Sequence, residues 1–368
     1  MKTPSKWSSN LPTKASRDGF ALIIVMVTIA ILGGIAVHFA TNMQVELKLA
    51  QNSNYDADFE VIGLSGVEYA RYVLALEGKK NMTYEPFDAL HQIWAGGPGS
   101  ELVPEDQDLL LVSLTNNEIG NGIFSLKITD MERKWNINSA NEQMLEQAFI
   151  LMGVDFAEIS TYSATILDWM DPDELTRAGG AEIQDYLALD PPYVCKDGPM
   201  DDIFELTRVI GITPELFWGP SFDPARHSNL NDPNFDPIGL SDSGAAYSYG
   251  LKDIFTAISS GRINVNTAPA HVLQMIPGID ELTAMEIVNQ RAGPDGFPGT
   301  MDDSAYASPS MLPVLPDVMQ LASRFLTVRS LHFMVEVQVS INGITRTYEG
   351  LLRRESPEKI DILYLRRR

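Results

Sequence analysis

The sequence has few of the residues on which many enzymes and disulfide-bonded domains depend. Among its 368 residues there is one cysteine, Cys195, which excludes an intrachain disulfide and suits a partly buried structural thiol. The five histidines are scattered, and the sequence shows no serine-hydrolase triad order, HExxH pattern or phosphate-binding loop. We therefore expect a protein that is not an enzyme, and keep a membrane-anchored periplasmic hydrolase built on paired carboxylates as an alternative.

Basic residues are also scarce relative to acidic ones. The chain holds 27 Lys and Arg against 49 Asp and Glu, which gives a formal net charge of −22. The first 19 residues are nevertheless basic, so the rest of the chain is more acidic still. Because such a body is repelled by phosphate, we expect no nucleic-acid partner. The acidity suits divalent cations, basic partners or simple solubility.

One long hydrophobic run lies near the N-terminus. Residues 20–40 contain no Asp, Glu, Lys or Arg, and as a helix they would be ~31 Å long, enough to cross a bilayer core. The basic leader at 1–19 is expected to stay in the cytoplasm, with the acidic body across the membrane. A cleaved secretory signal fits less well, because no small-x-small site follows at the right distance. The run therefore predicts a single-pass anchor in membrane lipid.

The helical pattern continues beyond the anchor. Apolar residues recur every three or four positions, which predicts one helical face that packs against a domain. With no proline between Phe20 and Glu85, we predict a single helix from Phe20 to about Leu76, with a membrane part at 20–40 and an amphipathic part at 41–78. The predicted packing face comprises Tyr55, Phe59, Ile62, Gly66, Tyr69, Val73 and Leu76.

Strand patterns frame the body at both ends. Residues 123–130 alternate in hydrophobicity, and Asn121-Gly122 suits a hairpin turn within a first sheet segment at 79–137. Further strands around the turn Asn342-Gly343 fall within residues 321–368. Residues 138–320 read as mostly helical or irregular, with a mobile loop expected at the Pro-, Asn- and Asp-rich stretch 220–250. These patterns predict an α+β fold, in which the N-terminal helix packs on a small antiparallel sheet interrupted by a large helical insertion.

The predicted insertion contains a weak internal repeat. Segments from Asn136 and Asn264 each begin Asn-x-Asn-Ser/Thr-Ala, a pattern suited to capping a helix. Around Gly278-Ile279-Asp280 the sequence resembles a helix-hairpin-helix, a module often used on DNA backbones. Because the acidic Asp280 replaces the second glycine of the DNA-binding form, we interpret the module as a structural helix pair.

Two acidic groups are candidates for binding a cation. Asp171, Asp173 and Glu182 offer hard oxygen ligands, and Gly179-Gly180 lets the chain bend inward, as a calcium site requires. The alternative is a solvated acidic loop in which Asp caps a helix. A second candidate calcium site consists of Asp295, Asp302 and Asp303.

Gly19 and Phe20 form the junction between the leader and the apolar helix. A basic leader ending in Gly, followed by Phe and an apolar helix that becomes amphipathic, resembles a type IV pilin-like signal. The resemblance implies cleavage between these two residues by a prepilin peptidase and methylation of the new Phe20 amine. Members of that family normally carry glutamate at the fifth mature position, where it is thought to meet the terminal amine of the subunit above. Ile24 stands at this position, and so points to a subunit with nothing above it.

Five short motifs follow one another through the body. They are Asp168-Trp169-x-Asp171-x-Asp173, Gly180-Ala181-Glu182, Pro192-Tyr193, Glu205-Leu206 and Asn264-Val265-Asn266-Thr267-Ala268. Together they resemble the minor pseudopilin K family of type II secretion systems. The resemblance implies a non-catalytic subunit at the tip of a periplasmic pseudopilus, anchored in the bacterial inner membrane, with calcium in the inserted domain. It also implies assembly with minor pseudopilins I and J and other pseudopilins, while a minor subunit of a type IV pilus is the alternative.

Overall fold

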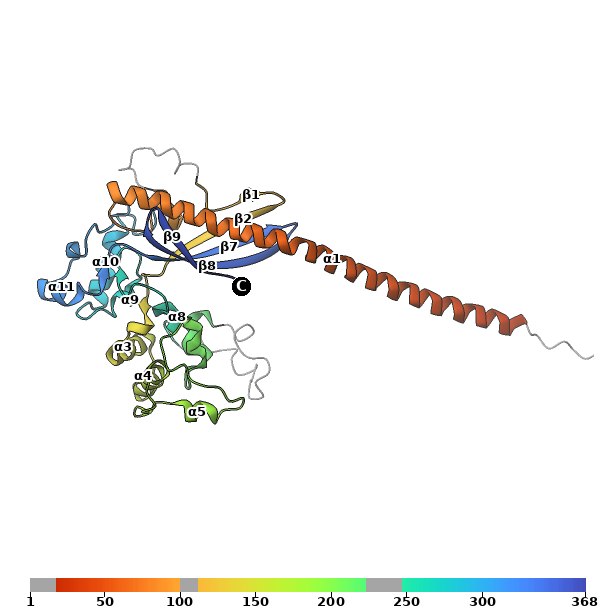
Figure 1. Cartoon of the computed structure of the whole chain (residues 1–368), viewed down its shortest axis with the longest axis horizontal. Coiled ribbons are helices and arrows are strands. Elements are labelled where there is room, and N and C mark those ends of the chain that lie inside the picture. Colours follow the sequence, from red (N-terminus) through yellow and green to blue (C-terminus); the bar gives the residue numbers. More distant parts are fainter. Residues whose placement is uncertain (1–17, 100–111, 223–246) are drawn as a thin grey trace, which may run out of the picture. The chain divides into compact units, whose positions relative to one another are not determined.

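A single helix, α1 (Asp18–Thr83), opens the described part of the chain. The computed structural model describes residues 18–99, 112–222 and 247–368, which are coloured in Figure 1. The predicted long helix is confirmed, but it continues past its predicted end at about Leu76. Two buried charged residues in this extension explain the error, since Glu77 and Lys80 interrupt the apolar pattern while lying in the core. The Lys80 ammonium lies 3.1 Å from the Glu85 carboxylate, which compensates its burial.

The chain divides into two compact units, Met1–Glu60 and Val61–Arg368. The first unit carries the apolar part of α1, in which Leu22–Leu47 has a mean hydropathy of 2.6 and is long and apolar enough to cross a membrane. This stretch extends past the predicted end of the membrane segment at Ala40. Most of the predicted leader at 1–19 lies outside the described residues.

The second unit contains a five-stranded antiparallel sheet with the order β1-β2-β7-β8-β9. The chain leaves this sheet after β2 and returns to it with β7, so one sheet is interrupted by a long insertion, as predicted (Figure 1). We call residues 131–331 the inserted region. The strands are β1 (Asn117–Ile119), β2 (Gly122–Asp130), β7 (His332–Ile341), β8 (Ile344–Ser356) and β9 (Lys359–Arg367).

Two tight turns fix the register of the sheet. Asn342-Gly343 links β7 to β8 as predicted, and both residues have positive φ, as a type I′ hairpin requires. The other predicted turn, Asn121-Gly122, is wrong by one residue. Because Gly122 already pairs within β2, the turn residues are Gly120-Asn121. A Cβ at Gly122 would lie 2.7 Å from the Ile62 side chain, so this glycine serves close packing inside the strand.

The predicted alternation along β2 buries one face of the sheet. Side chains of β2 and β7 that face inward lie opposite one another in the register, so each apolar residue meets another across the strands. The pairs are Phe124 with Val339, Leu126 with Val337, Ile128 with Val335, and Asp130 with Phe333. Only the last pair brings a charged side chain into this buried face.

Small residues of α1 bring the helix close to the sheet. A Cβ added at Gly66 would lie 2.4 Å from Cγ1 of Val337, and one at Gly63 would lie 2.5 Å from Cδ2 of Tyr348. Larger side chains at these two positions would therefore push the helix away from the strands. The short distance between α1 and the sheet therefore depends on these two glycines as well as on the burial of apolar side chains.

The predicted packing face of α1 is distributed over both units. In the second unit Ile62, Gly66 and Val73 are buried, and Tyr69 and Leu76 are half-buried. The face is broader than the predicted stripe, because several neighbouring positions are buried as well. These additional residues are Gly63, Val67, Ala70 and Leu74. Tyr55 and Phe59 precede Val61 and belong to the first unit.

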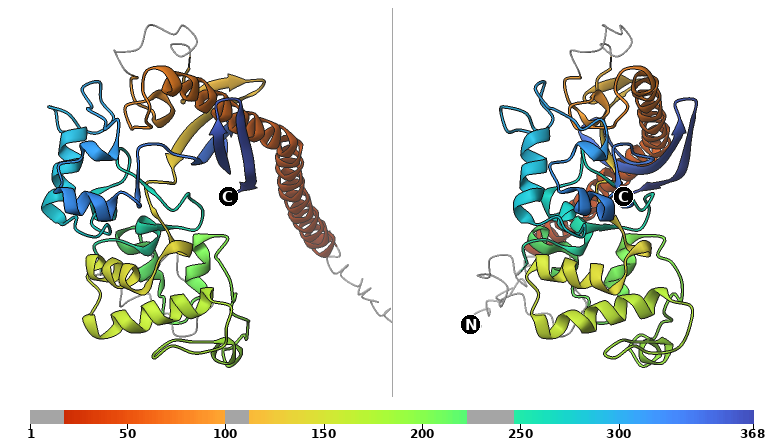
Figure 2. Two further views of the ribbon diagram at one scale, coloured as in Figure 1. Left: turned by 60° about the vertical axis from the view of Figure 1, so that its left-hand side comes forward. Right: turned by 90° about the vertical axis from the view of Figure 1, so that its left-hand side faces the viewer.

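The inserted region is built mainly from short helices, as predicted. Figure 2 shows its yellow-green helices α3 to α5 on one side and its cyan-to-blue helices α9 to α11 on another. One continuous cluster of buried apolar residues joins the two groups. The helices are α3 (Glu142–Met152), α4 (Phe156–Met170), α5 (Ile183–Leu187), α6 (Pro214–Trp218), α8 (Leu251–Ile254), α9 (Ala270–Leu273), α10 (Glu281–Arg291) and α11 (Pro316–Ala322). The 3-10 helices of the inserted region are η2 (Ile137–Ser139), η3 (Ile203–Arg208), η4 (Gly219–Ser221) and η5 (Pro309–Met311), while η1 (Ile93–Ala95) precedes the sheet.

Short strands also occur in and beside the inserted region. Parallel pairing joins β3 to β4 and β5 to β6, and these pairs were absent from the prediction because two-residue strands carry no periodicity. The predicted first sheet segment at 79–137 therefore ends differently, since β3 pairs away from the main sheet. Most of the loop predicted at 220–250 lies outside the described residues. The strands are β3 (Trp135–Asn136), β4 (Phe255–Thr256), β5 (Ile263–Asn264) and β6 (Leu326–Thr327).

Three hairpins in the inserted region share one construction. In each, a glycine with positive φ is followed by a buried aliphatic residue and then by a polar residue whose side chain caps the next helix. The predicted helix-hairpin-helix at 278–280 is one of them, and its acidic residue serves as the helix cap. The three tripeptides are Gly153-Val154-Asp155 before α4, Gly211-Ile212-Thr213 before α6, and Gly278-Ile279-Asp280 before α10.

A buried polar cluster ties both ends of the inserted region to the sheet. Asp130 ends β2 at an inward position, and its Oδ2 accepts hydrogen bonds of 2.5 to 3.1 Å from Thr267, Ser330 and Asn264. Burial, reinforced by the neighbouring Glu132 carboxylate, raises the pKa of Asp130 to about 7. The sheet and the inserted region are thus joined by hydrogen bonds that depend on one buried acid.

Candidate functional site

The N-terminal helix carries the residues predicted for processing and assembly. Gly19 and Phe20 lie in its first turn, while Ile24 lies near the start of the apolar stretch with a half-exposed side chain. Cleavage at this junction and methylation of Phe20 stay predictions.

The motif that starts at Asp168 forms an acidic cluster at the end of α4. The Asp168 carboxylate is fully buried, and its Oδ1 accepts a 2.6 Å hydrogen bond from Arg177, which also pairs with Asp171. A Cβ at Gly180 would lie 1.9 Å from Oδ2 of Asp168, so glycine is required where the returning chain passes this acid. The structure thereby explains the motif by close packing around buried charge.

Glu182 is the most unusual member of this cluster. It is 4% exposed, and its Oε1 is buried without a hydrogen-bond partner among the described residues. Burial, together with the charges of Asp168 and Asp171, raises the pKa of Glu182 to about 7. A buried carboxylate oxygen with no donor is a position that a cation would stabilise.

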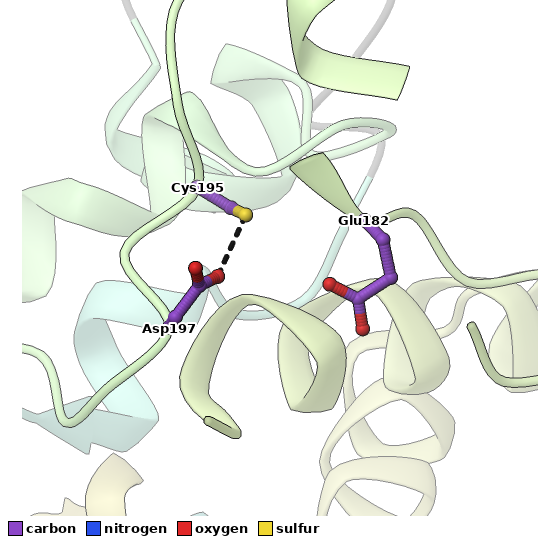
Figure 3. Close-up of side chains that lie close together, drawn as sticks. All are labelled: Glu182, Cys195 and Asp197. Atoms are coloured by element: carbon purple, nitrogen blue, oxygen red, sulfur yellow. Dashed lines mark hydrogen bonds between the residues drawn. The ribbon is translucent and has the colours of Figure 1, made fainter. Parts of the chain in front are cut away.

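The three predicted ligands of the first calcium site have different surroundings. Asp171 pairs with Arg177 through Oδ2, and its buried Oδ1 has no hydrogen-bond partner in the described part of the chain. Asp173 is exposed and accepts a hydrogen bond from the Leu175 backbone N–H. The third predicted ligand, Glu182, also lies beside Cys195 and Asp197. One ligand atom from each of these three residues lies within 4.8 Å of the other two (Figure 3).

Sequence reasoning assigned Cys195 a structural role and overlooked Asp197. The thiol is 5% exposed and donates a 2.7 Å hydrogen bond to Oδ1 of Asp197. Burial, together with the hydrogen bond to Asp197, raises the pKa of the Cys195 thiol to about 12. The available signal was the short spacing Cys195-x-Asp197, although it does not reveal that Glu182 approaches from α5.

The second predicted acidic group folds into a compact loop. Oδ2 of Asp302 accepts a hydrogen bond from the Asp295 backbone N–H at 3.0 Å, and Oδ1 accepts one from Thr300 at 2.8 Å. Asp303 turns inward and accepts hydrogen bonds from the Gly299 and Thr300 backbone. Backbone donors therefore satisfy much of the acceptor capacity of these carboxylates.

The repeated Asn-x-Asn pattern has a shared structural role. The side-chain amide of Asn138 exchanges hydrogen bonds with the backbone N–H and C=O of Met200, and Asn266 does the same with the backbone of Tyr306. Each second asparagine thus pairs with a distant backbone segment as a strand neighbour would. The predicted capping role is also present in the first repeat, where Asn136 caps η2 and Asn141 caps α3.

Two family models match the chain in the sheet and inserted region. Both are described as type II secretion system, protein K, and they match residues 116–218 and 263–310. Over these two stretches the chain is similar to the type II secretion system protein K family. The first match contains the acidic cluster and the hairpins before α4 and α6, and the second contains the hairpin before α10.

Comparisons with individual proteins agree with the family-model matches. The chain is 25% identical over 114 residues to the type II secretion system protein K of Pectobacterium carotovorum subsp. carotovorum, a match that covers 27% of this chain and 35% of that relative. Among solved structures, it resembles a chain of the GspK-GspI-GspJ complex from the enterotoxigenic Escherichia coli type 2 secretion system. That likeness has a TM-score of 0.58 at 16% identity, and covers 87% of this chain and 99% of the other, which supports the fold.

Proposed function

We propose that the protein is a minor pseudopilin of a type II secretion system that caps the tip of a periplasmic pseudopilus. In this role it helps to initiate pseudopilus assembly for the export of folded proteins across the outer membrane. The observation that carries the proposal is the pairing of one apolar helix with the body described by the protein K models. The basic leader keeps the N-terminus in the cytoplasm, while the anchor lies in the inner membrane and the body in the periplasm.

The tip position follows from two features. A stacked subunit needs a free upper face and a carboxylate at the fifth mature position, where this chain has Ile24. The inserted region adds a large helical body beside a five-stranded sheet, which would obstruct a subunit placed above it. A terminal subunit tolerates both features because nothing has to stack on it.

We further propose minor pseudopilins I and J as direct partners. A structural neighbour was solved in a complex of GspK, GspI and GspJ, which supports this choice. The partners would contact the side of α1 that faces away from the sheet, where Leu64 is 45% and Tyr72 is 47% exposed. Apolar packing between helices needs no charge pair inside the membrane, in agreement with Ile24.

The test is cross-linking through engineered cysteines in the full chain. Leu64→Cys and Tyr72→Cys should cross-link to pseudopilins I and J, whereas Leu321→Cys on α11 is the matched exposed control. Because the native Cys195 is buried, it should contribute few cross-links of its own. Abundant cross-links between copies of this chain would place it along the shaft and overturn the tip assignment.

A gene deletion separates the secretion role from the alternative pilus role. Loss of protein export with normal twitching supports secretion, and the reverse supports a type IV pilus subunit. Gly19→Val should leave the leader attached, because the peptidase needs an unhindered backbone at the cut, and mass spectrometry of the mature N-terminus reads this directly.

We also propose that calcium binds the acidic cluster as a structural ion. Its support is a pair of buried oxygens, one on Asp171 and one on Glu182, that lack a hydrogen-bond partner within the described ranges. Calcium is held by carboxylate oxygens together with backbone carbonyls and water. Asp173 would join them from the exposed side, and Asp295, Asp302 and Asp303 form the second candidate. Bound calcium would replace part of the charge compensation that Arg177 provides.

A further inference from the structure

A second kind of donor lies on the other side of Glu182. We infer that Glu182, Cys195 and Asp197 form a site for a thiophilic divalent cation such as Zn²⁺. Their ligand atoms lie within 4.8 Å of one another, close enough to contact one ion after small side-chain adjustments, and Figure 3 shows the three side chains near a common space. The site is distinct from an all-oxygen calcium site because one of its donors is sulfur.

The polar groups of this site are unsatisfied in a way that suits a cation. Glu182 is nine-tenths buried, and its Oε1 has no partner among the described residues. Lys196 does not compensate it, because its ammonium pairs with Asp201 at 2.6 Å and Glu205 at 2.7 Å. Asp197 accepts its hydrogen bond from the thiol itself, and no ion pair of Glu182 or Asp197 with a basic side chain occurs among the described residues.

The chemistry of the donors favours a borderline or soft ion. Calcium and magnesium prefer oxygen ligands, whereas zinc readily takes sulfur and oxygen ligands together in four-coordinate sites. On binding, the Cys195 S–H bond breaks, the sulfur electron pair binds the ion, and the proton passes to solvent. Asp197 accepts the thiol hydrogen bond beforehand and is exposed, so it provides a route for both the proton and the entering ion.

Local backbone geometry holds these donors in place. Asp197 has φ of +52°, a conformation in which Asp is tolerated better than most residues, and it directs the carboxylate back to the thiol two residues earlier. Glu182 is fixed from the other side as the N-cap of α5, where the Asp185 side chain accepts a hydrogen bond from the Glu182 backbone N–H at 2.9 Å. Three protein ligands are thus positioned by two separate segments, leaving a fourth position for water.

The experiment is a titration of the chelator-treated full chain in detergent with Cd²⁺ and then with Zn²⁺. Because Cys195 is the one cysteine of the sequence, a cadmium–thiolate charge-transfer band in the ultraviolet must come from it. Wild type should give this band at one ion per chain, and Zn²⁺ should displace the cadmium. Cys195→Ser should abolish the band. It should also weaken Zn²⁺ binding by at least roughly tenfold, because even the loss of a residue that only hydrogen-bonds to a metal ligand weakens metal binding by about that factor.

Two further variants distinguish a built site from a lone reactive thiol. Asp197→Asn retains the thiol and tolerates the same backbone conformation, and Glu182→Gln retains the size of the side chain. Both should weaken cadmium binding by roughly tenfold while circular dichroism stays native. Unchanged cadmium affinity in both folded variants, or no band in folded wild type, would overturn the inference.

The same series separates this site from the proposed calcium site. Asp171→Asn should reduce calcium binding and leave the cadmium band unchanged, whereas Cys195→Ser should do the opposite. Glu182→Gln should weaken both calcium and cadmium binding, because Glu182 is the residue that the two sites share. These readouts do not depend on protein export, so failure of the metal site and failure of the pseudopilus role are distinguishable.

Discussion

The sheet and the inserted region are stabilised in different ways. In the sheet, the four long strands have 9 to 13 residues and place apolar side chains opposite one another, and α1 packs against the sheet through glycines. In the inserted region, helices of 4 to 15 residues are joined by capped hairpins and by side-chain amides that bind distant backbone. In a short helix most backbone N–H and C=O groups lie at the ends, where they need a partner outside the helix. Short helices therefore depend on caps and tertiary contacts more than long elements do.

The largest expected effect lies in the sheet, at its contact with α1. Gly66→Val should destabilise the second unit by about 1–3 kcal/mol, because the new side chain meets Val337 with no room to relax. Thermal unfolding of the full chain in detergent measures this. Leu64→Val is the matched control, since it puts the same residue on the exposed side of the helix. Equal effects of the two variants would show that the helix does not depend on this close contact.

Calcium should act on the inserted region and spare the sheet. If calcium binds the acidic cluster only in the folded protein, it should stabilise the fold by ~2.7 kcal/mol at one hundred times its dissociation constant. Hydrogen exchange should slow at α4 and α5 on adding calcium, with β7 and β8 much less affected. Asp171→Ala with Asp173→Ala should remove this response, whereas Glu118→Ala on β1 should not. An unchanged exchange pattern in wild type would argue against calcium.

The junction between the two regions should depend on pH through Asp130. Its pKa is about 7 in the folded state and near 3.8 when exposed, so the folded state binds the proton more tightly. The stability contributed by this proton is complete below about pH 4 and is lost as the pH rises through about 7. The stability difference between wild type and Asp130→Asn should therefore fall by on the order of 2 kcal/mol between pH 5 and 7. A constant difference over this range would mean that Asp130 is ionised throughout.

The smallest expected effect concerns the helix caps of the inserted region. Asp155→Ala should cost about 1 kcal/mol, because the Ala157 N–H at the start of α4 loses its acceptor. Asp155→Asn keeps a capping oxygen and should stay close to wild type. Urea unfolding of the two variants provides the comparison. If the alanine variant is as stable as the asparagine variant, tertiary packing alone fixes this hairpin.

Much of the sheet and little of the site were accessible from the sequence. The alternation in residues 123–130 and the turn Asn342-Gly343 predicted strands that the structure contains. The same alternation placed Asp130 on the buried face of β2, and this position was the sequence signal for the buried polar cluster around it. For the acidic cluster, sequence spacing favoured Asp171 and Asp173 as ligands. In the structure Arg177 pairs with the Asp171 carboxylate, and the Leu175 backbone N–H donates a hydrogen bond to the Asp173 carboxylate.

By itself the sequence determined the apolar anchor helix, the hairpins and the family motifs, because each depends on residues within a short distance along the chain. Only the tertiary structure decided which acids lie together. Glu182 and Asp197 belong to different segments, and they meet at Cys195 because the chain between α5 and η3 folds back on itself. The same holds for Asp130, whose partners lie more than one hundred residues away in sequence. Burial of charge is a property of the packed fold, and local sequence patterns do not contain it.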